Sequence, residues 1–136
     1  MLEDWGFTQV TEDTKEQTRA AKLNALDQYA SNKSFVIYGK SIWVDDATRQ
    51  RLRISLDAYN SMNIDIATKW FDGVEYTFSV QDWYDMMAAV EVYASDFDNN
   101  IERHRAAINA LQTEQEIEDY DFTTGYPQPL RFLTND

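Results

Sequence analysis

The stretch DFDNN, residues 96–100, has side chains that could bind a cation, because its acids and amides alternate like the first ligands of a calcium-binding loop. That loop needs glycine at its sixth position, for a sharp turn, and glutamate at its twelfth, as a bidentate ligand. This chain has Ile101 and Ala107 at those two positions. The pattern therefore does not predict a calcium site.

The single histidine, His104, is the other natural starting point for chemistry, but it lies in an apolar pattern and reads as a core histidine. The chain has no cysteine, so a zinc site would depend on carboxylates, which is unusual. A serine–histidine–acid triad has only His104 to use, and no serine has a nucleophile-elbow context. Pairs such as Glu118 and Asp121 arise by chance among 24 acids. We expect no catalytic residue, no metal site and no cofactor.

The net charge of −12 limits the partners of the chain. Direct binding to a nucleic-acid backbone or an anionic membrane surface requires a basic surface, so neither is expected. No stretch is long and apolar enough to predict a membrane-spanning helix. An acidic inhibitor that mimics DNA remains one alternative, and a solvated acidic surface is the plainer interpretation.

At 136 residues the chain is expected to form one domain. The predicted organisation is an N-terminal arm at 1–12, a single α+β domain at 13–122 and an extended C-terminal tail at 123–136. Helices are predicted at about 13–31, 46–63 and 81–112, with a short helix capped by Thr113 and Glu116 after them. The fold class is α+β, with two short β-hairpins interleaved with helices, one long C-terminal helix and extended terminal arms.

Two hairpins are predicted from turn residues between β-rich runs. FVIY and SIWV flank Gly39, which permits the positive φ of a tight turn. Asp72-Gly73 is a stronger hairpin signal, because both positions of a type I′ turn favour φ > 0.

The helix at 46–63 is expected to be capped by Asp45 or Asp46. Its predicted apolar face consists of Leu52, Leu56 and Tyr59, joined by Ile54 and Met62. The arginines at 49, 51 and 53 are expected on a solvated face, paired with nearby acids. A phosphate site there is the minor alternative.

The long helix has an apolar seam whose spacing alternates between four and three residues. The seam runs from Trp83 through Met87, Val90, Ala94, Phe97, Ile101, His104 and Ile108 to Leu111. Such a heptad pattern fits a coiled coil between copies, and it also fits a helix packed within its own domain. In the second case the seam would pack on the helices at 13–31 and 46–63.

The terminal segments combine aromatic and aliphatic side chains with poor periodicity. We expect them to contact partners, with docking on the chain's own core as the alternative. The predicted contact residues are Trp5, Phe7, Tyr126, Leu130, Phe132 and Leu133.

The order of these motifs resembles a domain family of unknown function found in tail-fibre and other virion-associated proteins of tailed bacteriophages. The resemblance runs from about Phe35 to Tyr126. It depends on FVIYGKSIWVDDATRQRLRISLDAY, then KWFDGVEYTFSVQDWYDMMAAVEVY, then NNIERHRAAINAL. The shared order is a strand pair, an acidic step, an arginine-containing helix, a tryptophan-containing strand with a short turn, and a long helix with an arginine near its middle.

The resemblance implies a non-enzymatic structural or attachment role in the virion, after synthesis in the host bacterial cytoplasm. The expected partners are other virion proteins, and a homotrimer is an option through the seam of Met87, Val90, Phe97, Ile101, His104, Ile108 and Leu111. Family members often end a longer fibre chain. Here the module fills most of the chain, which favours a separate tail- or fibre-associated subunit or an adaptor. A tail-fibre assembly chaperone is the alternative.

Overall fold

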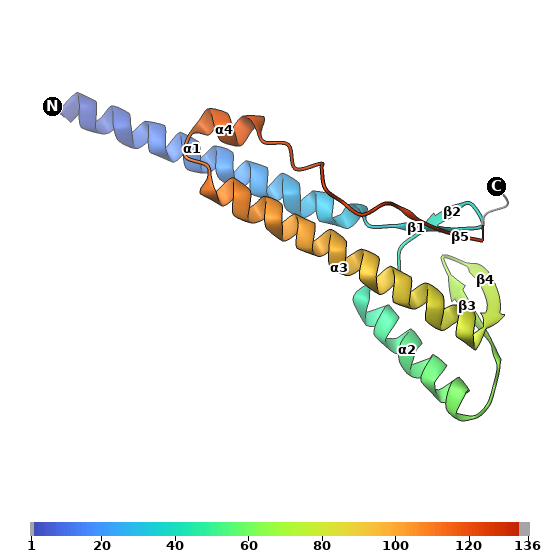
Figure 1. The fold of residues 1–136 in the computed structure, drawn as a ribbon. Helices are drawn as coiled ribbons and strands as arrows, with labels where there is room; N and C mark the ends of the chain where they lie inside the picture. Colours follow the sequence, from blue (N-terminus) through green and yellow to red (C-terminus); the bar gives the residue numbers. More distant parts are fainter. Residues whose placement is uncertain (1, 134–136) are drawn as a thin grey trace. The chain divides into compact units, whose positions relative to one another are not determined.

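The computed structural model describes the backbone of residues 2–133 and the side chains of residues 12–133. Its elements are α1 (Leu2–Tyr29), a 3-10 turn (Ala30–Asn32), β1 (Phe35–Ile37), β2 (Lys40–Ile42), α2 (Asp46–Ser61), β3 (Ile66–Phe71), β4 (Val74–Ser79), α3 (Val80–Ala110), α4 (Glu114–Asp119) and β5 (Leu130–Phe132) (Figure 1). The predicted α+β fold, with two hairpins among helices and one long helix, is confirmed.

The described residues form two compact units, each built from segments that are distant in sequence. Unit 1 combines Met1–Asn32 with Asp96–Pro127, and unit 2 combines Lys33–Ser95 with Gln128–Asp136. Helix α3 therefore contributes its first half to unit 2 and its second half to unit 1. The predicted boundaries near residues 12 and 122 do not coincide with this division.

Unit 2 contains a three-stranded sheet in the order β2-β1-β5. Strand β1 pairs antiparallel with β2 and parallel with β5, with Phe35 opposite Leu130 and Ile37 opposite Phe132. The sequence predicted an extended tail and did not predict its third strand, because three residues after two prolines have no periodicity to read. In the folded chain the two rings of Phe35 and Phe132 meet edge to face.

Strands β3 and β4 form a separate two-stranded sheet joined by the predicted turn. Asp72 has φ 51° and Gly73 has φ 75°, as a two-residue hairpin turn requires. The first hairpin has the same kind of turn, with φ 51° at Tyr38 and 79° at Gly39. Its strands are shorter than predicted: Tyr38 belongs to the turn after β1, and β2 ends at Ile42.

The core of unit 2 is organised around Trp83, which is fully buried near the start of α3. Its indole N–H donates a hydrogen bond to the carbonyl oxygen of Ala67 at 2.9 Å. Its ring meets those of Phe71 and Phe78 edge to face. The helix therefore covers one face of the β3–β4 hairpin, and Leu56 of α2 is buried in the same core.

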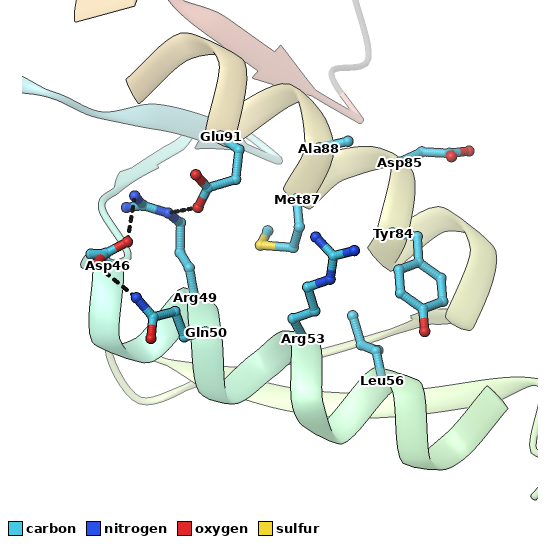
Figure 2. Close-up of a pocket in the computed structure, with 10 residues that line it drawn as sticks. All are labelled: Asp46, Arg49, Gln50, Arg53, Leu56, Tyr84, Asp85, Met87, Ala88 and Glu91. Carbon is cyan, nitrogen blue, oxygen red and sulfur yellow. Dashed lines mark hydrogen bonds and ion pairs between the residues drawn. The ribbon is translucent and has the colours of Figure 1, made fainter. Parts of the chain in front are cut away.

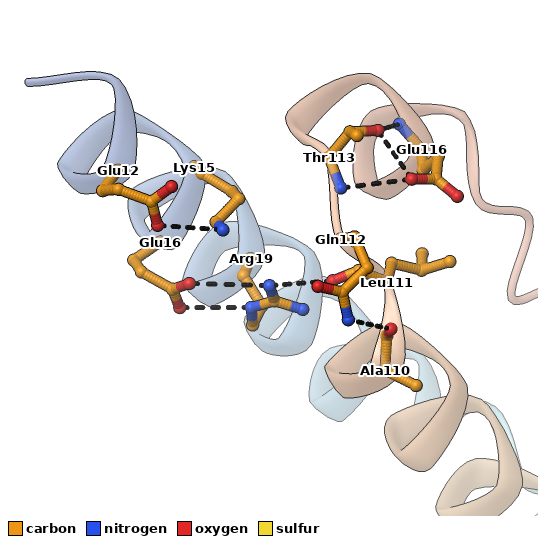
Figure 3. Close-up of polar contacts among 9 residues, drawn as sticks. All are labelled: Glu12, Lys15, Glu16, Arg19, Ala110, Leu111, Gln112, Thr113 and Glu116. Atoms are coloured by element: carbon orange, nitrogen blue, oxygen red, sulfur yellow. Dashed lines mark hydrogen bonds and ion pairs between the residues drawn. The ribbon is translucent and has the colours of Figure 1, made fainter. Parts of the chain in front are cut away.

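Unit 1 is held by cations of α1 that reach the carboxyl ends of two other helices. At the end of α3, Arg19 donates to the carbonyl oxygen of Leu111 at 3.0 Å (Figure 3) and to that of Ile108 at 2.6 Å. Lys22 donates to the carbonyl oxygens of Glu118 and Tyr120, at the end of α4. Carbonyls at helix ends lack intrahelical donors, so the two cations supply hydrogen bonds where α3 and α4 end, and the Ile108 oxygen also accepts from the Leu111 amide.

The capping signals predicted for α2 and α4 are confirmed. The Asp45 carboxylate accepts a hydrogen bond from the Thr48 amide and caps α2. Thr113 and Glu116 form the reciprocal capping box of α4, also visible in Figure 3. The Ser79 hydroxyl accepts from the Asp82 amide at the start of α3.

Two expectations about helices were wrong. Helix α1 begins at Leu2, so residues 2–12 continue a helix where we predicted an extended arm. No proline interrupts this segment, so the helix can propagate through it. On α2, Ile54 is 70% exposed, and Met62, which follows the helix, is 72% exposed, whereas Leu52 and Leu56 are buried. Ile54 is two residues from Leu52, about 200° around the helix, and so faces away from the core.

We predict that Gly73→Val lowers the free energy of unfolding by about 1 kcal/mol or more, because a β-branched residue resists the left-handed backbone conformation. A Cβ added at this position meets no atom within 4 Å, so the effect comes from the backbone alone. Urea unfolding measures it, and Gly73→Asn is the matched control with a smaller expected loss. An unchanged unfolding midpoint in the valine variant would contradict the turn.

Candidate functional site

The candidate site is a groove of about 760 Å³ in unit 2, between α2 and the first half of α3 (Figure 2). It is lined by Asp46, Arg49, Gln50, Arg53, Leu56, Tyr84, Asp85, Met87, Ala88 and Glu91. Apolar side chains and charged side chains both face it. A groove of this size can accept several side chains of a partner or a small molecule.

Helix α2 positions the basic side of the groove. The Asp45 cap sets where the helix begins, and the Thr48 hydroxyl and amide lower the pKa of the Asp45 carboxyl by hydrogen bonding to its ionised form. Arg49 and Arg53 are four residues apart, so they lie on one face of α2, next to the buried Leu52 and Leu56. That face is turned toward α3.

Arg49 is a structural residue of this groove. Its side chain is only 9% exposed, and its guanidinium donates to the carbonyl oxygen of Val44 at 2.7 Å. It also pairs with Glu91 of α3 and Asp46 of α2, and it lies over the ring of Trp43 at 5.2 Å. The prediction that this arginine pairs with nearby acids is confirmed, but it lies in the packing between helices and not on a solvated face.

Arg53 differs from Arg49 although it is one helical turn away. No hydrogen bond or ion pair joins its guanidinium to another side chain or backbone group in the described part of the chain, and Figure 2 shows it directed toward α3 beside Met87. The other polar lining groups do have partners.

Asp46 bonds Gln50 and Arg49, Asp85 accepts from Gln81, and the Tyr84 hydroxyl donates to Asp57. This bond to Asp57 raises the pKa of Tyr84. The groove thus combines one available guanidinium with an apolar floor.

His104 lies in unit 1 and is not part of this groove. Its Nε2–H donates to the carbonyl oxygen of Thr124 at 2.7 Å, and its Nδ1 is hydrogen-bonded to the Tyr120 hydroxyl at 2.6 Å. The Asn100 amide donates to the same Thr124 oxygen. Because a carbonyl can only accept, the hydrogen bond to Thr124 places the histidine proton on Nε2. His104 is a satisfied core histidine that holds the segment after α4 against α3.

The predicted oligomer seam is buried inside the single chain. Val90, Phe97, Ile101, His104 and Ile108 are buried, and Met87 and Leu111 are partly buried. Within unit 1, the ring of Phe97 meets those of Tyr29 on α1 and Tyr126, and His104 is hydrogen-bonded to Tyr120 and Thr124 of the segment that follows α4. The placement therefore matches intramolecular packing, and a homotrimer through this seam would require uncovering the core.

The predicted contact residues of the C-terminal tail also pack within the chain. The ring of Tyr126 lies tilted against that of Phe97, with 4.5 Å between centroids, and against that of Tyr29, with 5.1 Å between centroids. Leu130 and Phe132 belong to β5 and pack against the core of unit 2. Leu133 is exposed. Trp5 and Phe7 lie outside the residues whose side chains are described.

The structure exposes a different apolar surface, which the sequence reasoning missed. Ile64, Ile66 and Trp70 alternate along β3 and the residues before it, and all are exposed. The alternation at 64, 66 and 70 was the signal available in the sequence. We call these residues, with Thr68 and Thr77 beside them, the outer face of the β3–β4 hairpin.

In the described residues, no helix is long and apolar enough to cross a membrane, and no group of three or more histidine or acidic side chains is placed to hold a metal ion. Comparison of the chain with protein-family models, curated proteins and solved structures found no match.

Burial raises the pKa of Tyr126 to about 12, and we predict a matching loss of stability at high pH. The ordinary tyrosine pKa is about 10. Because the folded chain holds the phenol neutral beyond that value, this contribution to stability is complete below pH about 10 and is lost as the pH rises toward about 12. Phenolate absorbance, compared with Tyr126→Phe, measures the titration. Titration of Tyr126 near pH 10 in the folded chain would contradict its burial.

Proposed function

We propose that this chain is a non-enzymatic structural or attachment protein of a bacteriophage virion, a tail- or fibre-associated subunit or an adaptor. The order of its sequence motifs supports this role. The observation on which it mainly rests is the outer face of the β3–β4 hairpin, which leaves large apolar side chains in water.

The hairpin has two chemically different faces. The inner face buries Ala67 and Tyr76 against α3 and α2. On the outer face, Trp70 is 62% exposed and Ile66 is 60% exposed. Exposed tryptophan and isoleucine gathered on one sheet face are typical of surfaces that another protein covers, because tryptophan dominates many interface hot spots.

The outer face is also built to keep its shape without a partner. Thr68 and Thr77 hydrogen-bond across the strands at 2.7 Å between their hydroxyl oxygens. The Asp72-Gly73 turn fixes the register of both strands. A rigid apolar surface lowers the entropy that is lost on association, which suits a permanent contact in a particle.

Other virion proteins are the proposed partners, and the outer face takes the place of the α3 seam as the contact. A homotrimer, if one forms, would use this face. Direct binding to nucleic acid is not part of the proposal, because the chain carries −12 net charge.

The test is mass spectrometry of purified particles of the phage that encodes the chain, with variants introduced into that phage. Wild-type protein should be present at a fixed copy number. Trp70→Ser and Ile66→Ser should each lower incorporation by about tenfold or more while keeping the far-ultraviolet dichroism of the wild type.

Val92→Ser is the control, because Val92 is also exposed but lies on α3. Unchanged incorporation of both hairpin variants would contradict the proposed contact. Wild-type protein that is absent from particles but bound to fibre proteins in the infected cell would instead identify an assembly chaperone.

A further inference from the structure

We propose that the groove between α2 and α3 binds a helix of a partner protein, and that the helix presents apolar side chains around one aspartate or glutamate. The groove is a second binding surface beside the outer face of the β3–β4 hairpin. The proposal rests on the proposed function only in treating the chain as a protein that binds other proteins.

The floor of the groove fits an apolar helix face. Leu56 comes from α2, and Met87 and Ala88 come from α3. Methionine is flexible and polarisable, so Met87 can adapt to side chains of different shape. A groove with walls formed by two helices commonly accepts a third helix through residues one turn apart. Its volume of about 760 Å³ is enough for a few side chains of such a helix.

Arg53 specifies the charge of the occupant. Among the polar residues that line the groove, it is the only one without a hydrogen bond or ion pair to the described part of the chain. Arg53 is exposed, and its guanidinium points toward α3 beside Met87 of the apolar floor, so an incoming side chain can reach it (Figure 2). A carboxylate can accept two parallel hydrogen bonds from a guanidinium, so one acidic side chain satisfies this group.

The rest of the rim excludes a polyanion. Asp46, Asp85 and Glu91 also line the groove, and each already has an intramolecular partner. These three carboxylates would repel a nucleic acid or a phosphate-rich ligand. One available cation among them fits a single carboxylate within an otherwise apolar face, and it does not fit a run of negative charges.

The experiment begins with a display library of helical peptides of about 16 residues, selected on the full chain. Selected peptides are then labelled and their affinity is measured by fluorescence anisotropy. We expect an aspartate or glutamate between apolar positions, and we expect its change to asparagine or glutamine to weaken binding about tenfold or more. Nuclear magnetic resonance should place the perturbed amides on α2 and the first half of α3.

Variants of the chain test whether binding depends on Arg53 itself or only on the total charge of the chain. Arg53→Glu and the milder Arg53→Gln should each weaken binding about tenfold or more, and a peptide with lysine in place of its acid should recover affinity for Arg53→Glu. Arg51→Glu makes the same charge change on the same helix, outside the groove, and should stay within about twofold of the wild type. Circular dichroism checks that each variant is folded.

Three binding results would overturn the inference. These are the absence of any selected peptide, selected peptides without acidic residues, or equal affinity for wild type and Arg53→Glu. A doubling of mass in light scattering that is lost in Arg53→Glu would show a second copy in the groove, which also overturns it. None of these results bears on incorporation into particles, so the proposed virion role fails or succeeds separately.

Discussion

The apolar seam of helix α3 is the constraint on which the rest of the structure depends. A helix of 31 residues cannot leave a continuous apolar stripe in water, so every part of the stripe needs a cover. In unit 2 the cover is the β3–β4 hairpin, α2 and the small sheet, arranged around Trp83. In unit 1 the seam contacts α1 and the segment that follows α4. The chain forms two compact units because different segments pack on the first and the second half of this one helix.

In unit 1, two cations of α1 donate hydrogen bonds to backbone carbonyls at the ends of α3 and α4. Carbonyls at helix ends lack intrahelical donors, and those ends carry partial negative charge. Arg19 and Lys22 are three residues apart on α1, so they face the same side and reach both ends. Positive charge is scarce in this acidic chain, and here it is placed where backbone oxygens need donors.

Unit 2 shows that identical residues can have different roles one turn apart. Arg49 is enclosed by Trp43, Glu91 and Val44, so it fixes the spacing between α2 and α3. Arg53 lies one turn further along, where the helices leave space, and its charge stays available.

The β3–β4 hairpin likewise has one face packed on the core and one face left exposed. A two-stranded sheet with one face on the core must show the other face to water or to a partner.

Much of the local structure was determined by the sequence alone, because it depends on neighbouring residues. The turn at Asp72-Gly73, the Asp45 cap, the Thr113–Glu116 capping box and the long helix were all predictable from short-range chemistry. So was the interpretation of His104 as a core residue. The start of α1 was missed, since the segment contains Gly6, which disfavours a helix, and has no clear apolar period.

Only the tertiary structure decided which segments pack on the apolar seam of α3. A heptad pattern fits packing within a chain and between chains equally well. It also decided that Leu130–Phe132 add a strand beside β1, a pairing between residues about a hundred positions apart that no local pattern encodes. The different roles of Arg49 and Arg53 depend on what α3 places opposite each of them. Sequence specifies which face of an element is apolar, whereas contact between distant segments specifies what covers it.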